Sequence, residues 1–210
     1  MATVRFPEDV TISGNLQVDG SILPGITRAT LIQTDFAEYG VPFATLHIWD
    51  AMQTAISTAG NDDLGLSTGG TFGTDAPYIS AGDLKAAGAT TRRARFLFTL
   101  PPEYVAGQSV RIVATAGMVT TVADTSCTVD VEAYKSDKDA TVGGSDLVTT
   151  AATTINSLTF AAKNFEVTSS GLSAGDVLDI RVSIACTDAA TVTAVIPAIA
   201  HLALALDIKG

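Results

Sequence analysis

The residues best suited to chemistry lie in one polar stretch near the middle of the chain, residues 136–146. It holds three carboxylates, Asp137, Asp139 and Asp146, and hard cations such as calcium take several oxygen ligands of this kind. The stretch lacks the central glycine and the closing glutamate of an EF-hand loop, and Lys138 interrupts the acids. A solvated turn is therefore the default, with structural calcium as the alternative. We predict no bound metal and no cofactor.

A second pair of carboxylates, Asp130 and Glu132, lies two residues apart in an alternating segment. On a strand the two would share one face at about 7 Å from each other, a spacing within the loose range for the two acids of a glycosidase. Alternating acids are, however, ordinary on the solvent face of an outer strand. We interpret the pair as a solubility feature.

Other reactive groups lack the partners that catalysis needs. The two histidines, His47 and His201, have no second histidine at metal-ligand spacing, so we expect structural or rim positions for both. The chain also contains no Gly-x-Ser-x-Gly elbow and no phosphate-binding loop. We predict that the protein is not an enzyme.

The two cysteines, Cys127 and Cys186, both fall on the apolar face of a predicted strand. Two cysteines are too few for a disulfide framework, so we expect buried and unreactive thiols. A disulfide is possible only if the two strands are neighbours, and the spacing alone does not decide this.

Alternating apolar and polar residues predict the strands that must position these groups. The predicted strands are residues 94–100, 109–116, 127–134, 155–160, 164–167, 178–186 and 202–208. Short strands separated by polar turns are typical of an antiparallel sandwich with one solvent-facing side per sheet. Glycine turns at Gly107 and Gly175 each lead into a strand, as at the end of a jelly roll. We predict an all-β chain in which residues 92–210 form a jelly-roll-like antiparallel β-sandwich.

Residues 1–26 are predicted to form a separate N-terminal β arm. The sequence repeats a six-residue unit, at 10–15 and 16–21, with a glycine at its fifth position, and its apolar positions are Val10, Ile12, Leu16, Val18 and Ile22. Each unit is too short to bury its apolar face alone. The face packs either on its own domain, as a hairpin, or on other subunits, as an extended arm. We favour the arm and assign these five residues to oligomer or capsid contact.

Residues 27–91 are rich in Gly, Asp, Thr and Ser, and we expect an irregular connecting segment packed on the core. Trp49 lies in a segment, residues 46–52, that fits a strand or a helix, and we favour the start of a strand. It is the only tryptophan. We assign it to the same contact set, as the anchor of the arm on the main domain.

The overall charge excludes two classes of partner. The chain has 210 residues, with 12 Lys and Arg against 22 Asp and Glu, and a formal net charge of −10. Nucleic acids and anionic membrane surfaces both need a basic face, so we expect neither partner. No segment reaches the ~18 apolar residues of a membrane span. The N-terminal residues show no apolar signal segment, which predicts synthesis in the cytoplasm.

The sequence from Ile12 to Ile22 is similar to the Gly-Asn-Leu-x-Val-x-Gly arms of tailed-phage fibre and head-decoration proteins. Further motifs resemble a family of phage virion proteins: Trp-Asp-Ala at 49–51, Asn-Asp-Asp-Leu-Gly at 61–65, Gly-Thr-Phe-Gly-Thr at 70–74 and Leu-Pro-Pro-Glu-Tyr-Val-Ala-Gly at 100–107. Together they cover most of the chain. The resemblance implies a homotrimeric structural protein of a phage capsid or fibre, with no catalytic residues.

We therefore expect a non-enzymatic virion protein, assembled in the host cytoplasm: a trimeric capsid decoration or cement protein. Its arm would attach it to the major capsid protein or another shell protein. The alternative is a receptor- or glycan-binding domain at a fibre or spike tip. Glycan binding usually needs exposed aromatic side chains, for which Tyr78, Tyr104 and Tyr134 are the candidates, although each also suits packing.

Overall fold

The computed structural model describes residues 36–68, 70–85, 88–120, 122, 125–188 and 193–208. The chain divides into two units, Met1–Thr34 and Asp35–Gly210, and every described residue belongs to the second. The apolar residues of the arm, Val10, Ile12, Leu16, Val18 and Ile22, lie outside the described residues. Their assignment to oligomer or capsid contact stays a prediction.

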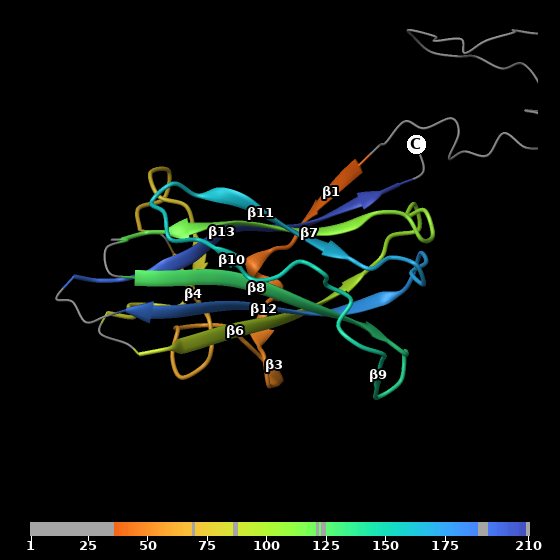
Figure 1. Ribbon diagram of the computed structural model, residues 1–210, viewed down its shortest axis with the longest axis horizontal. Helices are drawn as coiled ribbons and strands as arrows, with labels where there is room; N and C mark the ends of the chain where they lie inside the picture. The colour runs from red at the N-terminus through yellow and green to blue at the C-terminus, as the bar shows by residue number, and fades with distance from the viewer. Residues whose placement is uncertain are drawn as a thin grey trace, which may run out of the picture. The chain divides into compact units, whose positions relative to one another are not determined.

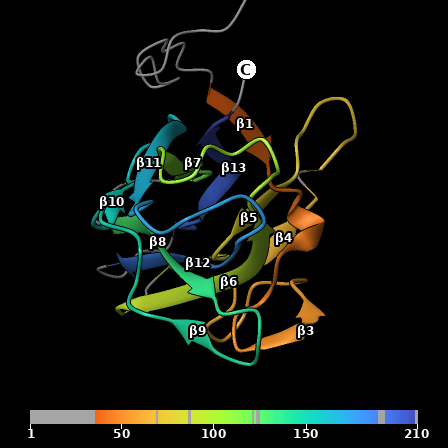
Figure 2. The same ribbon diagram turned by 90° about the vertical axis from the view of Figure 1, so that its right-hand side faces the viewer.

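Two antiparallel sheets packed face to face make up the described part of the chain (Figures 1 and 2). Sheet A has the order β11-β7-β13-β5-β4, with β1 also paired to β13, and sheet B has the order β10-β8-β12-β6-β2-β3, with β9 paired to β8. The strands are β1 Phe36–Gly40, β2 His47–Ile48, β3 Ala51–Ala55, β4 Gly65–Ser67, β5 Tyr78–Ser80, β6 Thr90–Thr99, β7 Val110–Met118, β8 Thr125–Ser136, β9 Val142–Gly143, β10 Thr153–Thr154, β11 Ala161–Val167, β12 Val177–Asp188 and β13 Pro197–Asp207. The predicted all-β, jelly-roll-like sandwich is confirmed.

The long strands change sheet from one to the next along the chain. Strands β6, β8 and β12 lie in sheet B, whereas β7, β11 and β13 lie in sheet A. Their alternating sequences place one apolar row between the sheets: in β8 and β12, for example, Val131 is paired with Val182 and both are buried. No helix among the described residues is long and apolar enough to cross a membrane.

The two predicted glycine turns lie side by side at one end of the sandwich. Gly107 and Gly175 have φ values of 73° and 80°, a region that other residues rarely adopt. The amide of Gly107 donates to the carbonyl of Leu172 (3.0 Å), and that of Gly175 donates to the carbonyl of Leu100 (2.8 Å). The turns therefore join the loops that enter β7 and β12.

The predicted strand at residues 155–160 is wrong. Ile155 is buried, but residues 157–159 form a bend. The Ser157 hydroxyl accepts a hydrogen bond from the amide of Thr159 (3.1 Å), and such local bonds compete with strand pairing. The neighbouring strand, β11, starts at Ala161 and is longer than predicted.

The segment expected to be an irregular connection contributes five short strands, β1 to β5, to both sheets. A 3₁₀ turn at Phe43–Thr45 follows β1. The segment around Trp49 is a hairpin rather than one continuous strand, because the chain turns at Trp49 and Asp50 between β2 and β3. This turn holds Trp49 outside the space between the sheets.

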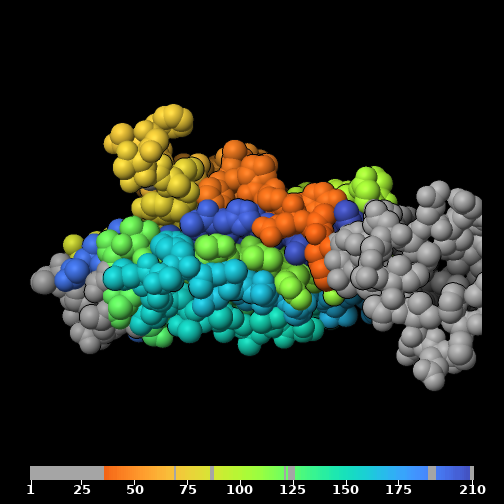
Figure 3. All heavy atoms as spheres, turned by 90° about the horizontal axis from the view of Figure 1, so that it is seen from above, coloured from red at the N-terminus to blue at the C-terminus, as the bar shows by residue number. Residues whose placement is uncertain are grey.

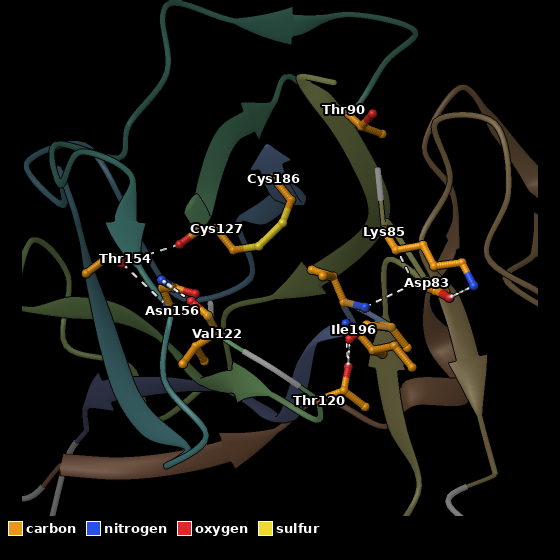
Figure 4. The surroundings of a disulfide bond; sticks show 12 residues. Asp83, Lys85, Thr90, Thr120, Val122, Cys127, Thr154, Asn156, Cys186 and Ile196 are labelled. Atoms are coloured by element: carbon orange, nitrogen blue, oxygen red, sulfur yellow. Dashed lines mark hydrogen bonds and ion pairs between the residues drawn. A yellow bond between two sulfur atoms is a disulfide. The ribbon is translucent and has the colours of Figure 1, made fainter. Parts of the chain in front are cut away.

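The expectation of free, unreactive thiols is wrong, because Cys127 and Cys186 form a disulfide (Figure 4). The two residues lie directly opposite each other on β8 and β12, with their Cα atoms 4.2 Å apart. This short distance is typical of a non-hydrogen-bonded pair in an antiparallel ladder. Both residues are buried, so the bond links β8 to β12 on the inner face of sheet B.

Candidate functional site

A trough of about 290 Å³ lies on the outer face of sheet B. The hairpins that carry β3 and β9 both lie on this side of the sheet, beyond the layer formed by β8, β12 and β6 (Figure 2). The trough is lined by Trp49, Asp50, Arg95, Tyr134, Val142, Asp179 and Arg181. These residues come from five separate strands and turns, which the fold brings to one place.

The floor of the trough follows from the alternation of three neighbouring strands. Inward residues of β6, β8 and β12 form the core, so the residues between them point outward. The register places Arg181 of β12 between Arg95 of β6 and Glu132 of β8, and Asp179 next to Tyr134. Charged side chains on adjacent outward positions thus form one continuous polar surface.

Two ion pairs fix this polar surface. Arg95 donates to both carboxylate oxygens of Asp179, with its Nε 2.6 Å from Oδ1. Arg181 donates from two of its nitrogens to one oxygen of Glu132, with its Nε 2.6 Å from Oε2. The hydrogen bonds to Asp179 raise the pKa of Arg95, and paired, planar groups of this kind have a fixed direction for further hydrogen bonds.

Trp49 forms one wall of the trough and is half-buried. Its indole Nε1 donates to Asp62 (2.9 Å). The guanidinium carbons of Arg93 and Arg181 lie 5.2 and 5.3 Å from its ring centroid, within cation–π distance. These contacts hold the tryptophan over its own sheet B, while any contact with the arm would involve residues outside the described range.

Tyr134 and Val142 form the opposite wall, and Val142 is 47% exposed. Of the three tyrosines considered for glycan binding, Tyr134 is thus the one in the trough. Tyr104 is buried, and its hydroxyl donates to the carbonyl of Gln108 (2.6 Å). Because it is buried, Tyr104 serves in packing, and burial also raises the pKa of its hydroxyl. Tyr78 lies in a different hollow, on sheet A.

The three carboxylates considered for calcium each bond to nearby groups of the same hairpin. Asp146 Oδ1 accepts from the amides of Ala133 (2.9 Å) and Val148 (3.0 Å). Asp139 accepts from the hydroxyl and the amide of Thr141, which lower its pKa, and Asp137 accepts from the same hydroxyl (3.3 Å). No group of three His, Cys, Asp or Glu among the described residues is arranged to hold a metal ion.

The remaining candidate residues lie on solvent-facing positions. Asp130 accepts from the amide of Val131 (3.0 Å), and burial followed by the neighbouring charges of Glu132 and Asp146 raises its pKa. His201 is exposed and lies 3.7 Å from Glu38, a rim position of the kind expected.

Five residues of the trough were not singled out from the sequence: Asp50, Arg95, Val142, Asp179 and Arg181. A signal for three of them was present, since Arg95, Asp179 and Arg181 alternate with apolar residues inside predicted strands. The order of the strands cannot be read from the sequence pattern, and this order decides whether the charged side chains lie next to each other.

No family model and no curated protein matches the chain. Several solved structures are similar to it at a low level, and two of them are carbohydrate-binding domains. The CBM22-1 xylan-binding domain from Paenibacillus barcinonensis Xyn10C is 10% identical, covering 84% of this chain and 97% of that chain, with a TM-score of 0.42. TmCBM61 in complex with β-1,4-galactotriose is 10% identical, covering 80% and 86%, with a TM-score of 0.39. At this level of similarity, the geometry of the trough has to carry a functional assignment by itself.

Proposed function

We propose that the protein is a carbohydrate-binding module whose site is the trough on sheet B. The observation that carries this proposal is the placement of Trp49 and Tyr134 on opposite walls above a floor of paired charged groups. A sugar ring has apolar C–H faces and a rim of hydroxyls. An aromatic side chain packs against the C–H face of a sugar. Fixed carboxylate and guanidinium groups form hydrogen bonds with the hydroxyls.

The charges of the trough favour a neutral saccharide. Arg95 is paired with Asp179, and Arg181 is paired with Glu132, so the floor carries no unbalanced cation that would select an acidic sugar. Asp50 remains at the exposed rim and disfavours anions further. The volume of about 290 Å³ lies at the small end of the range for small-molecule sites, which suits one or two sugar residues.

A receptor-binding role on a virus particle is one setting for such a site. The resemblance to phage virion proteins supports this setting, because a fibre or spike tip binds glycans on a host surface. The role as a trimeric capsid decoration protein rests on the resemblance and on the arm, and it is independent of the trough.

A glycan array followed by isothermal titration calorimetry tests the proposal. We expect binding to neutral oligosaccharides and a loss of about tenfold in affinity for Tyr134→Ala, equivalent to about 1.4 kcal/mol. Tyr134 is suited to this test because its ring stands on the outer face of β8, so its removal leaves the core intact. Thermal unfolding of the variant confirms that it is folded.

Leu158→Ala is the matched control, since Leu158 is exposed on the other side of the sandwich. Its affinity should equal that of the original protein. The proposal is overturned if no glycan binds with millimolar affinity or better, or if both variants bind the glycan as tightly as the original protein.

A further inference from the structure

An apolar groove of about 520 Å³ lies at one end of sheet A, on the opposite side of the sandwich from the trough. Its lining includes Tyr78, Met118, Val119, Leu158 and Phe160, and no lining residue is charged. Val119 is 39% exposed and Leu158 is 60% exposed. Apolar side chains gathered in this way on the surface of a protein mark a site of interaction.

The groove is held open by close packing beneath it. Phe160 lies against Gly117 of β7, where an added Cβ would stand 3.1 Å from the phenyl ring and from the Phe160 Cα. The amide of Met118 donates to the carbonyl of Ser157 (2.7 Å), which ties the bend at residues 157–159 to β7. The hollow is therefore formed before anything binds in it.

The same chain presents an apolar side chain of matching kind. Phe72 is 101% exposed, the highest value among the large apolar residues described. It stands in the loop at residues 70–77, yellow in Figure 3, which projects beyond the surface around it. Phe72 does not occupy the groove of its own chain, although Pro77 of the same loop lines that groove.

Hydrogen bonds within the loop fix this presentation. The carboxylate of Asp75 accepts from the amide of Thr71 (2.9 Å). The carbonyl of Thr71 accepts in turn from the amides of Thr74 (3.1 Å) and Asp75 (2.9 Å). The turn that carries Phe72 is therefore ordered in the absence of a partner, so little conformational entropy is lost when the ring is buried.

We propose that Phe72 of one copy of this chain binds in the apolar groove of a second copy. The occupant must be apolar because the groove offers no charge to pair with, and an exposed phenylalanine on an ordered turn is such a group. Copies with a net charge of −10 repel each other, so they meet most easily through an uncharged knob and an uncharged hollow. A knob and a hollow at different positions on one chain allow either an open head-to-tail contact or a two-fold contact in which each copy fills the groove of the other.

The size of this contact sets its strength. A phenylalanine buries ~150–250 Å², well below the ~1,200 Å² of a stable interface. The contact alone is therefore expected to be weak and concentration-dependent. It becomes stable where other surfaces of the copies also meet, or where the copies are displayed side by side.

A photo-reactive benzoylphenylalanine at position 72 tests the proposal directly. Irradiation at high protein concentration should join position 72 of one copy to the wall residues at 119, 158 or 160 of another. Mixing isotopically labelled and unlabelled protein distinguishes a link between copies from a link within one chain. A link within one chain, a link elsewhere on the surface, or no link at all overturns the proposal.

Charge substitutions test the contact between Phe72 and the groove. Phe72→Asp removes the knob and Leu158→Asp blocks the hollow, and each variant alone should sediment as the monomer at concentrations where the original protein associates. A mixture of the two should form a dimer, because one intact knob and one intact hollow remain. Tyr134→Ala, on the opposite face, should associate like the original protein. Association of either Asp variant alone, or a mixture that stays monomeric, contradicts the proposal.

Discussion

At the scale of single residues, the loops of this sandwich are held by carboxylates that bind backbone amides. Asp176 is buried in the turn before β12, where it accepts from the amide of Ser173 (2.9 Å) and pairs with Lys135 (2.7 Å). Asp83 likewise accepts from the amides of Lys85 and Val195, both at 3.0 Å (Figure 4). Each carboxylate thus supplies an acceptor to loop amides that have no strand partner.

Asp176→Asn should lower stability in a pH-dependent way. Burial opposes ionisation of Asp176, but hydrogen bonds from Lys135 and Ser173 and the charges of Lys135 and Lys138 lower its pKa below 3.8. A lowered pKa means that the carboxylate stabilises the fold above pH 3.8, and that this contribution is lost as the pH falls through the folded-state pKa. Because Lys135 is partly exposed, we expect a loss of about 1–2 kcal/mol at pH 7.

Urea unfolding of both proteins at pH 7 and at a pH well below 3.8 measures this effect. The difference between them should shrink at the acidic pH. Glu103→Gln, at an exposed position in the turn after β6, serves as the control and should unfold like the original protein at both values. An equal loss for Asp176→Asn at both pH values would show that the carboxylate's charge is not involved.

Gly65→Ala should be among the most damaging of conservative changes. An added Cβ would lie 2.0 Å from the backbone nitrogen of Ala59 and 2.7 Å from the carbonyl carbon of Thr58. These are main-chain atoms of a segment tied to β4 by the hydrogen bond from Leu66 to Ser57 (2.8 Å), so they cannot move aside locally.

We expect a loss of about 3 kcal/mol or more for Gly65→Ala, at the upper end of overpacking effects. Gly171→Ala is the control, because its added Cβ would meet no atom within 4 Å. Chemical denaturation of the two variants provides the comparison, and equal midpoints would refute the close approach at Gly65.

At the scale of elements, register decides which side chains meet. Cys127 and Cys186 were assigned correctly to apolar faces, and Glu132 to an outward face, from alternation alone. Their partners could not be assigned, because alternation gives the face of a strand but not its neighbour. The pairing of β12 with both β6 and β8 creates the disulfide and the floor of the trough together.

Two other features were not predicted from the sequence, for different reasons. The segment at 155–160 has enough apolar residues for a strand, but the Ser157 side chain bonds to the local backbone instead. Trp49 was expected on a strand, yet it lies in a tight turn whose position depends on Asp62, Arg93 and Arg181. These partners are distant in sequence, so no local pattern reveals them.

Removing the disulfide should destabilise the fold without abolishing it. The bond closes a loop between residues separated by 59 positions, for which loss of loop-closure entropy predicts about 4 kcal/mol, and disulfides typically contribute about 2–4 kcal/mol. We expect a loss in this range for the double variant Cys127→Ala, Cys186→Ala, measured by guanidinium unfolding. Reductant should lower the midpoint of the original protein and leave that of the variant unchanged. If neither the double substitution nor reductant changed the unfolding midpoint, the disulfide would not contribute to stability as expected.

At the scale of the whole molecule, the two proposed surfaces lie on opposite sheets. The trough uses outward residues of sheet B, and the groove uses residues at the end of sheet A. A ligand in the trough therefore leaves the groove free. One protein can in this way bind a saccharide with one face while it contacts another copy with the other.

The fragment 35–210 should fold by itself. The buried core found among the described residues begins at Val41, and β1 is already paired with β13. We expect this fragment to unfold cooperatively, with a midpoint within a few degrees of that of the full chain, as measured by calorimetry. A fragment without a cooperative transition would show that residues 1–34 are needed for the fold.

The central strand of each sheet is one of the last two strands in the chain and is therefore synthesised late. Strand β12 lies between β6 and β8 in sheet B, and β13 lies between β7 and β5 in sheet A. On the ribosome, β6, β7 and β8 each keep one edge unpaired until these two strands arrive, and the unpaired edges stay open to wrong pairing. Such distant pairing also slows refolding to the millisecond-to-second range, which stopped-flow fluorescence of Trp49 can follow. Chaperones that shield nascent edges should therefore raise the yield of this protein more than that of a helical one of equal length.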